Sequence, residues 1–164
     1  YVYSKPWKGV QMSDEYRLIS IPDTRFYHCN IKTLNLIPNV MAAQQASEAG
    51  CNETVFVRDG YVTECSHSNI SMVKDGVFIT HPLDNLILPG TERKHIIRWC
   101  GELGIPVEER AFTLEELYTA DEILVTSTSH PSMRAMELNQ KAVGMKNPEL
   151  IQKLRDKYLN EIGK

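Results

Sequence analysis

One lysine of the sequence, Lys32, stands where its amine could do chemistry. It follows Ile31, and residues 25–31 are predicted to form a short strand that leads into it. Burial at the end of an apolar strand lowers the pKa of a lysine, because it disfavours the ammonium form. A neutral amine is what Schiff-base chemistry requires. Taken alone, however, Lys32 is more simply explained as a surface lysine at the end of a strand.

A carboxylate followed by small polar residues forms a second candidate. Glu64 ends a predicted strand and leads into the segment Cys65–Asn69, which is rich in hydroxyl groups and contains His67. Such a segment could bind a polar cofactor. By itself it is more simply explained as a solvated loop between two hairpins.

Two further segments could bind an anion. Gly90, Thr91 and Glu92 precede a predicted helix, and the free N–H groups at a helix start attract negative charge. The hydroxyl-rich run 127–129, which contains Thr128, follows a predicted buried strand and could donate to the same anion. In isolation, these segments are a plain helix start and an ordinary turn.

Composition narrows the class of protein. The 164 residues carry a formal net charge of only -3, so no basic field points to nucleic acid. No apolar run is long enough to span a membrane. His28, His81 and His95 show no metal-ligand spacing, and we expect no metal site. The four cysteines form no CxxC pair, which favours reduced thiols in a cytoplasmic protein. The chain begins without Met, which suggests a fragment or a processed product.

Helices and strands alternate along the chain, so the predicted class is α/β or α+β with a mixed sheet. Asp59-Gly60 and Asp75-Gly76 are turn signals for two hairpins. Thr113 and Glu116 are spaced as a capping box. No element is assigned to residues 10–20. Strands are predicted at residues 53–58, 61–65, 69–73, 77–80, 107–112 and 123–126, and helices at 35–48, 92–103 and 148–160, with a short one after Thr113.

Taken together, these segments resemble a known family. Residues 31–36, then Ala43-Gln44-Gln45-Ala46 and residues 50–53, are similar to the lysine segment of D-amino-acid aminotransferases, which are fold-type IV enzymes dependent on pyridoxal 5'-phosphate. Residues 62–69 resemble the family's "TE-x-S-x-SN" segment. Residues 80–82, 86–90 and 125–129 follow in matching order and spacing.

The resemblance implies a fold and a set of roles. The fold would be the family's larger domain, an α/β domain whose mixed sheet curls into a partial barrel with flanking helices. Lys32 would hold the cofactor and move the substrate proton, and Glu64 would pair with the pyridinium nitrogen. Residues 1–9 would be the remnant of an interdomain linker, and residues 10–164 the cofactor-binding catalytic domain, with the small N-terminal domain absent. Further cofactor contacts are implied for His67, Leu88, Thr91, Glu92 and Thr128.

Three departures from the family pattern affect these expectations. Glu92 stands where the family has a threonine that contacts phosphate, so phosphate binding is weaker unless Thr91 replaces it. His130-Pro131 replaces an acidic residue and a Thr-Pro pair after the late turn, which leaves the substrate contacts there open. By the resemblance, the small N-terminal domain, which in the family supplies a phosphate-binding arginine and groups that read the substrate carboxylate, is expected to be absent from this chain.

The implied reaction is amino transfer between an amino acid, best guessed as D-alanine, and a 2-oxo acid. Leu36 stands where branched-chain aminotransferases usually carry an aromatic residue. Branched-chain aminotransferase and aminodeoxychorismate lyase remain alternatives within the fold. A non-catalytic fragment or degenerate homologue is the alternative from another class. We expect a homodimer of the full-length protein, small-molecule partners only, and an isolated chain that is inactive.

Overall fold

A computed structural model describes residues 9–161, so all of the predicted linker except Gly9 lies outside the described residues. The strands are β1 (Met12–Pro22), β2 (Glu53–Arg58), β3 (Tyr61–Cys65), β4 (Asn69–Lys74), β5 (Val77–Thr80), β6 (Val107–Glu109), β7 (Glu122–Ser127), β8 (His130–Leu138) and β9 (Lys141–Ala142). The helices are α1 (Ile37–Glu48), α2 (Thr91–Glu102), α3 (Leu114–Thr119) and α4 (Pro148–Glu161).

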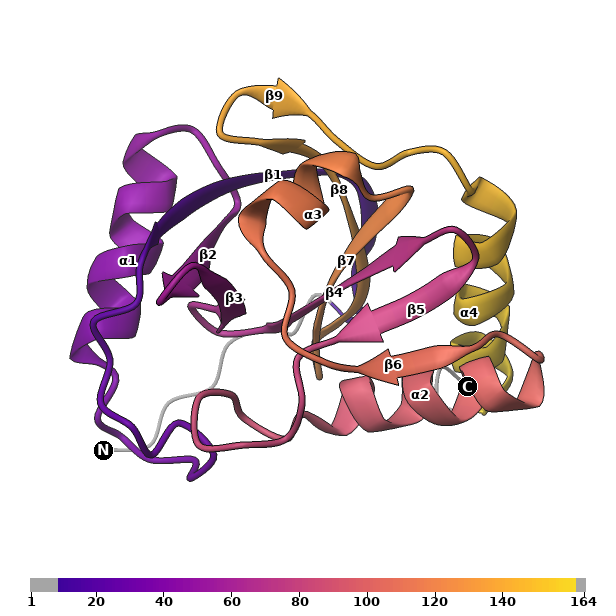
Figure 1. The fold of residues 1–164 in the computed structure, drawn as a ribbon, viewed down its shortest axis with the longest axis horizontal. Coiled ribbons are helices and arrows are strands. Elements are labelled where there is room, and N and C mark those ends of the chain that lie inside the picture. Colours follow the sequence, from indigo (N-terminus) through magenta and orange to yellow (C-terminus); the bar gives the residue numbers. More distant parts are fainter. Residues whose placement is uncertain (1–8, 162–164) are drawn as a thin grey trace.

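All nine strands belong to one mixed sheet with the order β3-β2-β1-β8-β7-β4-β5-β6, and β9 pairs with β8. β1 runs parallel to both β2 and β8, whereas the two hairpins and the β7–β8 pair are antiparallel. The sheet curls until β3 comes back beside the start of β4, where the Cys65 N–H donates to the Ser68 carbonyl. The predicted α/β partial barrel is confirmed (Figure 1).

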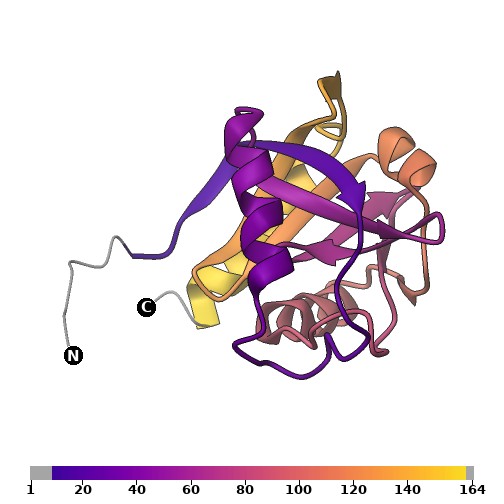
Figure 2. The same cartoon turned by 90° about the vertical axis from the view of Figure 1, so that its left-hand side faces the viewer.

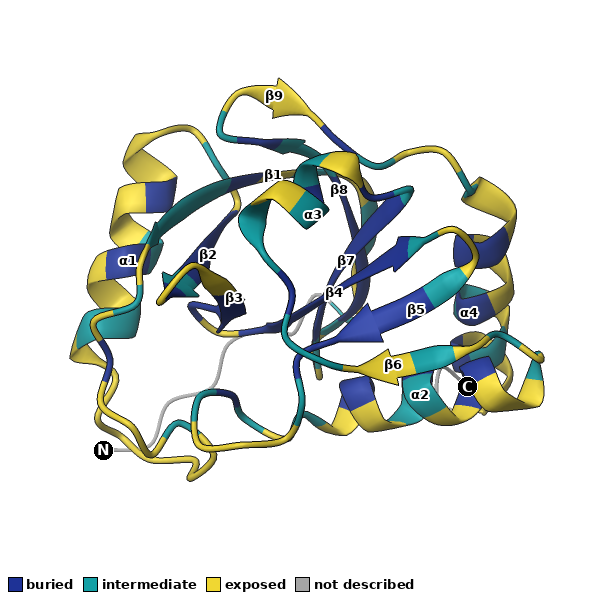
Figure 3. Ribbon diagram, viewed as in Figure 1, coloured by how far each residue is buried: buried dark blue, intermediate teal, exposed yellow. Residues whose placement is uncertain are grey.

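The curled sheet has a core on each face. Its concave face encloses the larger core, with Leu18, Met72 and Val125 fully buried and Leu117 of α3 covering the opening. α2 and α4 cover part of the convex face through a second core that includes Trp99 of α2. Figure 3 shows these buried positions on the strands and on the inner faces of α2 and α4. α1 lies outside β1 and β2 and is largely exposed (Figure 2).

Elements set by local sequence signals are predicted well. Both hairpins are confirmed, with Asp59 and Gly60 at φ of 51° and 85° in the first turn. The capping box of Thr113 and Glu116 is also present, since each side chain accepts from the other residue's N–H. The predicted helices start or end within two residues of α1, α2 and α4.

Elements that depend on distant partners are predicted poorly. β1 has charged residues within it, and one of them, Asp14, pairs at 2.7 Å with Arg155 of α4. The predicted strand 107–112 ends at Glu109, because the Phe112 carbonyl accepts from Val62 of β3 instead. The predicted strand 25–31 is wrong, and these residues form turns and irregular backbone. β8 was also missed.

Among residues 9–161, no helix has both the length and the apolar character needed to cross a lipid bilayer. The four cysteines are free.

Candidate active site

Most of the predicted site residues lie along one edge of the curled sheet. Asn69 begins β4 and pairs with Thr126 near the end of β7, so the loop before β4 and the turn after β7 are neighbours. Gly90, at the start of α2, lies against Asn69, and an ideal Cβ there would come within 2.0 Å of Asn69 Oδ1. Glu64 of β3 reaches the same place. This edge therefore brings together segments from four parts of the chain.

Glu64 is buried and is held by three donors. Its Oε1 accepts from Arg25 Nη1 at 2.5 Å, and its Oε2 accepts from Asn69 Nδ2 at 3.1 Å and from the Leu88 N–H at 2.9 Å. Burial raises the pKa of Glu64, and Arg25 and the Leu88 N–H only partly oppose this effect. The two carboxylate oxygens offer about four acceptor positions, so Glu64 can still accept one further hydrogen bond.

Arg25 is the cation that makes the burial of Glu64 possible. It also binds both oxygens of Asp23 at 3.0 and 2.9 Å and the Leu86 carbonyl at 3.1 Å. Its guanidinium stacks over the ring of Phe56 at 4.3 Å. Burial alone would lower the pKa of Arg25, but Asp23 and Glu64 raise it above its ordinary value. A fixed cation is thus buried beside the candidate ring partner.

The same network explains why residues 25–31 are not a strand. Asp23 Oδ1 accepts from the Arg25 N–H at 3.0 Å, which turns the chain directly after β1. The Arg25 side chain then folds over β2 and β3 instead of standing on a pleated sheet. Local side-chain bonds of this kind compete with strand pairing.

Lys32 lies in the irregular segment between β1 and α1. Two hydrogen bonds, one before Lys32 in the chain and one after it in α1, hold this part of the chain near Glu64. The Cys29 N–H donates to the Asn85 carbonyl, just before the loop that binds Glu64. On the other side, Asn39 Nδ2 donates to the Ser66 carbonyl at 2.6 Å. Figure 2 shows this segment passing near the start of α2. Lys32 is exposed, as expected of a surface lysine and not of a buried one, and the predicted strand before it is wrong.

The start of α2 offers backbone donors rather than side chains. Gly90 occupies the N-cap, and no side chain within the described part of the chain caps the helix. The first N–H groups of a helix have no intrahelical partner, and Thr91 and Glu92 supply two of them. Thr91 is exposed beside this opening. The arrangement suits a phosphate or another small anion.

The side chain of Glu92 is buried on the packing face of α2, at 6% exposure. Burial raises the pKa of Tyr158 in α4, and the charge of Glu92 adds to that effect. Its Oε1 has no hydrogen-bond partner among the described residues. Burial raises the pKa of Glu92 from 4.5 to about 7. The carboxyl group is therefore partly protonated near neutral pH.

At the end of β7, Thr128 is exposed in the turn, and Ser127 has a buried Oγ without a partner among the described residues. A buried hydroxyl without a partner is unusual and is satisfied when a ligand or water binds. Ser127 is therefore a further candidate donor beside Thr128, to which the resemblance pointed. His67 lies at the tip of the β3–β4 loop, with its Nδ1 at 2.9 Å from Glu53 Oε2.

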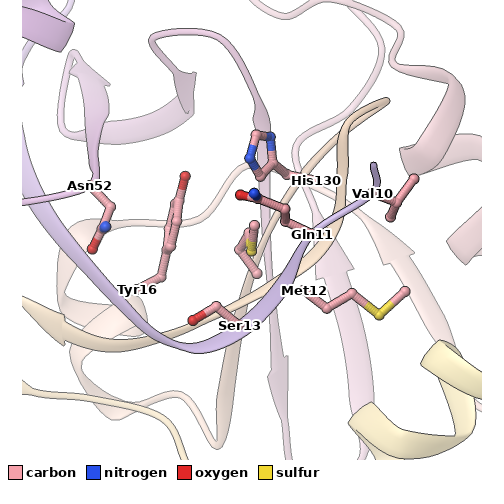
Figure 4. A pocket seen from close by; sticks show the side chains of 8 residues that line it. Val10, Gln11, Met12, Ser13, Tyr16, Asn52 and His130 are labelled. Carbon is pink, nitrogen blue, oxygen red and sulfur yellow. The ribbon is translucent and has the colours of Figure 1, made fainter. Parts of the chain in front are cut away.

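A pocket of about 600 Å³ lies beside this edge of the sheet. Its polar lining comes from Gln11, Ser13, Tyr16, Asn52 and His130. Figure 4 shows the polar ends of Tyr16, Gln11 and His130 pointing into the same space. The pocket thus lies along the N-terminal starts of β1 and β8.

The motifs in the sequence predicted part of this site. The structure brings together Glu64, the Leu88 N–H and the start of α2, as the motif order suggested. Asn69 stood inside the quoted motif without an assigned role. Arg25 and Glu53 were missed, because their partners lie 39 and 14 residues away in the sequence and no spacing rule connects them.

Comparison with known proteins identifies related chains. The sequence profile described as "Amino-transferase class IV" matches residues 1–138. The chain is 38% identical over 151 residues to a D-alanine aminotransferase of Bacillus licheniformis, covering 89% of this chain and 53% of that protein. It is 42% identical over 147 residues to a D-alanine aminotransferase of Listeria monocytogenes, covering 88% and 50%. The chain thus spans about half the length of these relatives.

Solved structures give the same picture. The branched-chain amino acid aminotransferase of Thermobaculum terrenum, in its PLP form, matches with a TM-score of 0.78 at 26% identity, over 87% of this chain and 49% of that one. A branched-chain amino acid aminotransferase of T.th., complexed with 4-methylvaleric acid, gives a TM-score of 0.80 at 27% identity, over 94% and 53%.

Gly90→Ala is expected to disturb the site, whereas Gly101→Ala in the same helix is not. The new Cβ would displace the Asn69 side chain, which is held by hydrogen bonds to Glu64 and to the Leu88 carbonyl. Losing these bonds should cost about 1–2 kcal/mol in the free energy of unfolding, measured by urea denaturation. Gly101 has open space around it, and its substitution should leave stability unchanged or raise it. Equal effects of the two substitutions would contradict this account.

Glu92→Gln is expected to change how stability depends on pH. Between about pH 4.5 and 7 the unfolded chain has lost the Glu92 proton while the folded chain keeps it. Stability therefore falls as the pH rises through this window, by up to about 3 kcal/mol. Urea denaturation at pH 5 and pH 8 should show that Glu92→Gln stabilises the protein more at pH 8. Glu48→Gln, at an exposed position of α1, is the control. If Glu92→Gln changes the free energy of unfolding by the same amount at both pH values, burial does not raise the pKa of Glu92.

Proposed function

The chain belongs to the amino-transferase class IV family, and on that basis we propose that it binds pyridoxal 5'-phosphate as the catalytic domain of an aminotransferase. The whole protein would exchange an amino group between an amino acid and a 2-oxo acid. D-alanine is the proposed amino donor, because relatives named D-alanine aminotransferase are 38–42% identical to this chain. The buried Glu64, fixed by Arg25 beside an uncapped helix start, is the observation that carries the proposal.

The residues at this edge of the sheet fit the cofactor's chemistry. A pyridinium nitrogen needs a carboxylate partner, and Glu64 retains acceptor capacity after its three hydrogen bonds. Arg25 favours the ionised form of Glu64, which is the form that can accept a hydrogen bond from the protonated ring nitrogen and keep it protonated. We therefore assign Glu64 as the ring partner and Arg25 as the residue that positions it.

The phosphate of the cofactor would be held at the start of α2. The N–H groups of Thr91 and Glu92 face outward from the helix start, and the Gly90 position leaves no room for a Cβ. The unpartnered Ser127 Oγ would add a hydroxyl donor from β7, with Thr128 beside it. Because the Glu92 side chain is buried on the packing face of α2, it opposes the phosphate less than its sequence position suggested.

Lys32 would supply the covalent attachment and the proton transfer. When bound, the cofactor supplies a conjugated ring that takes up the electron pair released at the substrate Cα. The Lys32 amine would remove the proton from the substrate Cα and deliver it to C4′ of the cofactor. The anchors at Cys29 and Asn39 keep its segment next to β3 and the 84–88 loop.

Lys32 is expected to be labelled selectively. Borohydride reduction in the presence of pyridoxal 5'-phosphate should fix the cofactor to Lys32 and to no other lysine, as read by peptide mapping with mass spectrometry. Lys32→Arg should abolish the label. Lys94, which is exposed on α2, is the internal comparison. A label spread equally over Lys32 and Lys94 would argue against a specific cofactor lysine.

Glu64→Gln is expected to slow amino transfer between D-alanine and 2-oxoglutarate by about 100-fold or more in the full-length protein, while Lys32 is still labelled. A neutral amide cannot keep the ring nitrogen protonated. Arg25 retains Asp23 as a partner, so the fold should persist, which circular dichroism checks. Glu15→Gln, at an exposed position of β1, is the control. Turnover by Glu64→Gln similar to that of the control would exclude Glu64 as the ring partner.

A further inference from the structure

The β3–β4 loop is built around a second buried carboxylate, Glu53, the first residue of β2. Its side chain is completely buried. Oε1 accepts from the N–H of Thr54 at 2.9 Å, from the N–H of Ser66 at 3.1 Å and from Ser66 Oγ. Oε2 accepts from Ser68 Oγ at 3.3 Å and contacts His67 Nδ1 at 2.9 Å. The proposed function leaves this network without a role.

The Glu53–His67 pair is asymmetric in its exposure. The carboxylate lies behind the loop, whereas 54% of the His67 side chain is exposed. The hydrogen bond to Glu53 raises the pKa of His67, against an opposing effect of burial. Because Nδ1 is occupied, Nε2 is the ring donor that remains free to meet a ligand. When the ring is protonated, Nε2 can donate its N–H to an approaching anion, while the negative charge of Glu53 is covered by loop donors.

The location of His67 ties it to the candidate site. It lies between Glu64 and Asn69, which close the loop by their hydrogen bond at 3.1 Å. Across the edge stands His130, whose pKa is lowered first by burial and then by the charge of His67. His130 lines the pocket next to the site, and so does Asn52, which directly precedes Glu53 in the chain. The pair formed by Glu53 and His67 at 2.9 Å therefore lies next to that pocket.

The pocket provides neutral donors for an anion. Its lining combines the hydroxyl groups of Ser13 and Tyr16, the amides of Gln11 and Asn52, and the imidazole of His130 (Figure 4). No carboxylate and no lysine or arginine lines it among the residues that the structure describes. A small carboxylic acid can therefore enter without meeting a like charge.

We propose that His67, oriented by Glu53, binds a carboxylate group of the substrate at the rim of this pocket. The proposal deepens the proposed function and rests on it, because it makes His67 a determinant of substrate binding in amino transfer. An exposed or half-exposed ion pair contributes modestly to affinity, so the site is expected to select carboxylic acids over their amides rather than to bind tightly.

A purely structural role for His67 makes a different prediction. If His67 served only to donate a hydrogen bond to Glu53, the NMR resonance of its ring would not shift when carboxylic acids are added. Asparagine at position 67 could still donate a hydrogen bond to Glu53 without carrying a charge. His67→Asn therefore separates the charge of the ring from the integrity of the loop.

The decisive experiment is an NMR titration of the full-length holoenzyme with selectively labelled histidine. Glutarate, which has neither an amino nor an oxo group, is the probe, and glutaramide is the matched neutral probe. Glutarate should shift the ring resonance of His67 in a saturable way, and glutaramide should not. The resonance of the exposed His28 is the reference for non-specific association. Equal shifts at His67 and His28, or equal shifts with the two probes, would overturn the proposal.

Variants supply the second readout. His67→Asn should weaken glutarate binding about five-fold and raise the KM for the amino donor similarly, with kcat unchanged. His67→Arg should restore most of the loss, and His28→Asn should have no effect. If the wild-type protein transfers no amino group, the proposed function fails, but the titration still decides whether His67 binds a carboxylate. If amino transfer is present and His67→Asn leaves KM unchanged, the carboxylate site is wrong and the proposed function stands.

Discussion

Glu64 has to stay buried at the edge of the sheet, and much of the surrounding structure follows from that requirement. Leaving a buried carboxylate without its cation costs about 3–5 kcal/mol. The donors that satisfy it come from the segment after β1, from the start of β4 and from the loop before α2. Three parts of the chain are therefore fixed against one another by a single side chain. The start of α2 takes its position from the same set of contacts, because Asn69 joins Glu64 to Gly90.

This requirement also limits what sequence patterns can reveal. Hairpin turns, the capping box and helix periodicity depend on residues close in sequence, and all of these predictions were confirmed. β1 was not predicted, because its charged residues suggest an exposed segment rather than a strand. One of them, Asp14, pairs with Arg155, which lies far along the chain. Residues 25–31 resemble a strand in composition, but Arg25 uses its hydrogen bonds on Asp23 and Glu64. Only the folded sheet brings these groups together.

The residues of the candidate site fall into the same two groups, those that sequence motifs indicate and those that only the fold reveals. Glu64, Leu88 and Thr91 followed from the order of the motif segments. Ser127 belonged to the predicted hydroxyl-rich run 127–129, but Arg25 gave no such signal, because burial beside a particular partner is a property of the fold. Glu92 was expected to face the phosphate from its position in the sequence. The side chain is instead buried, because its position belongs to the packing face of α2 that includes Trp99.

The two buried carboxylates, Glu53 and Glu64, show how neighbouring groups of the same chemistry acquire different properties. Burial acts on both, but the hydrogen bonds from His67 and Ser66 outweigh it at Glu53 and lower the pKa, whereas at Glu64 burial prevails and raises it. The residue paired with Glu64 is a buried arginine that remains charged, and the one paired with Glu53 is a half-exposed histidine whose charge depends on its protonation. Arg25 is buried and all three of its side-chain nitrogens already donate to protein groups, whereas the half-exposed His67 retains a second nitrogen for a ligand. The difference in the paired cation is therefore what separates a carboxylate suited to a ring nitrogen from one suited to orienting a substrate contact.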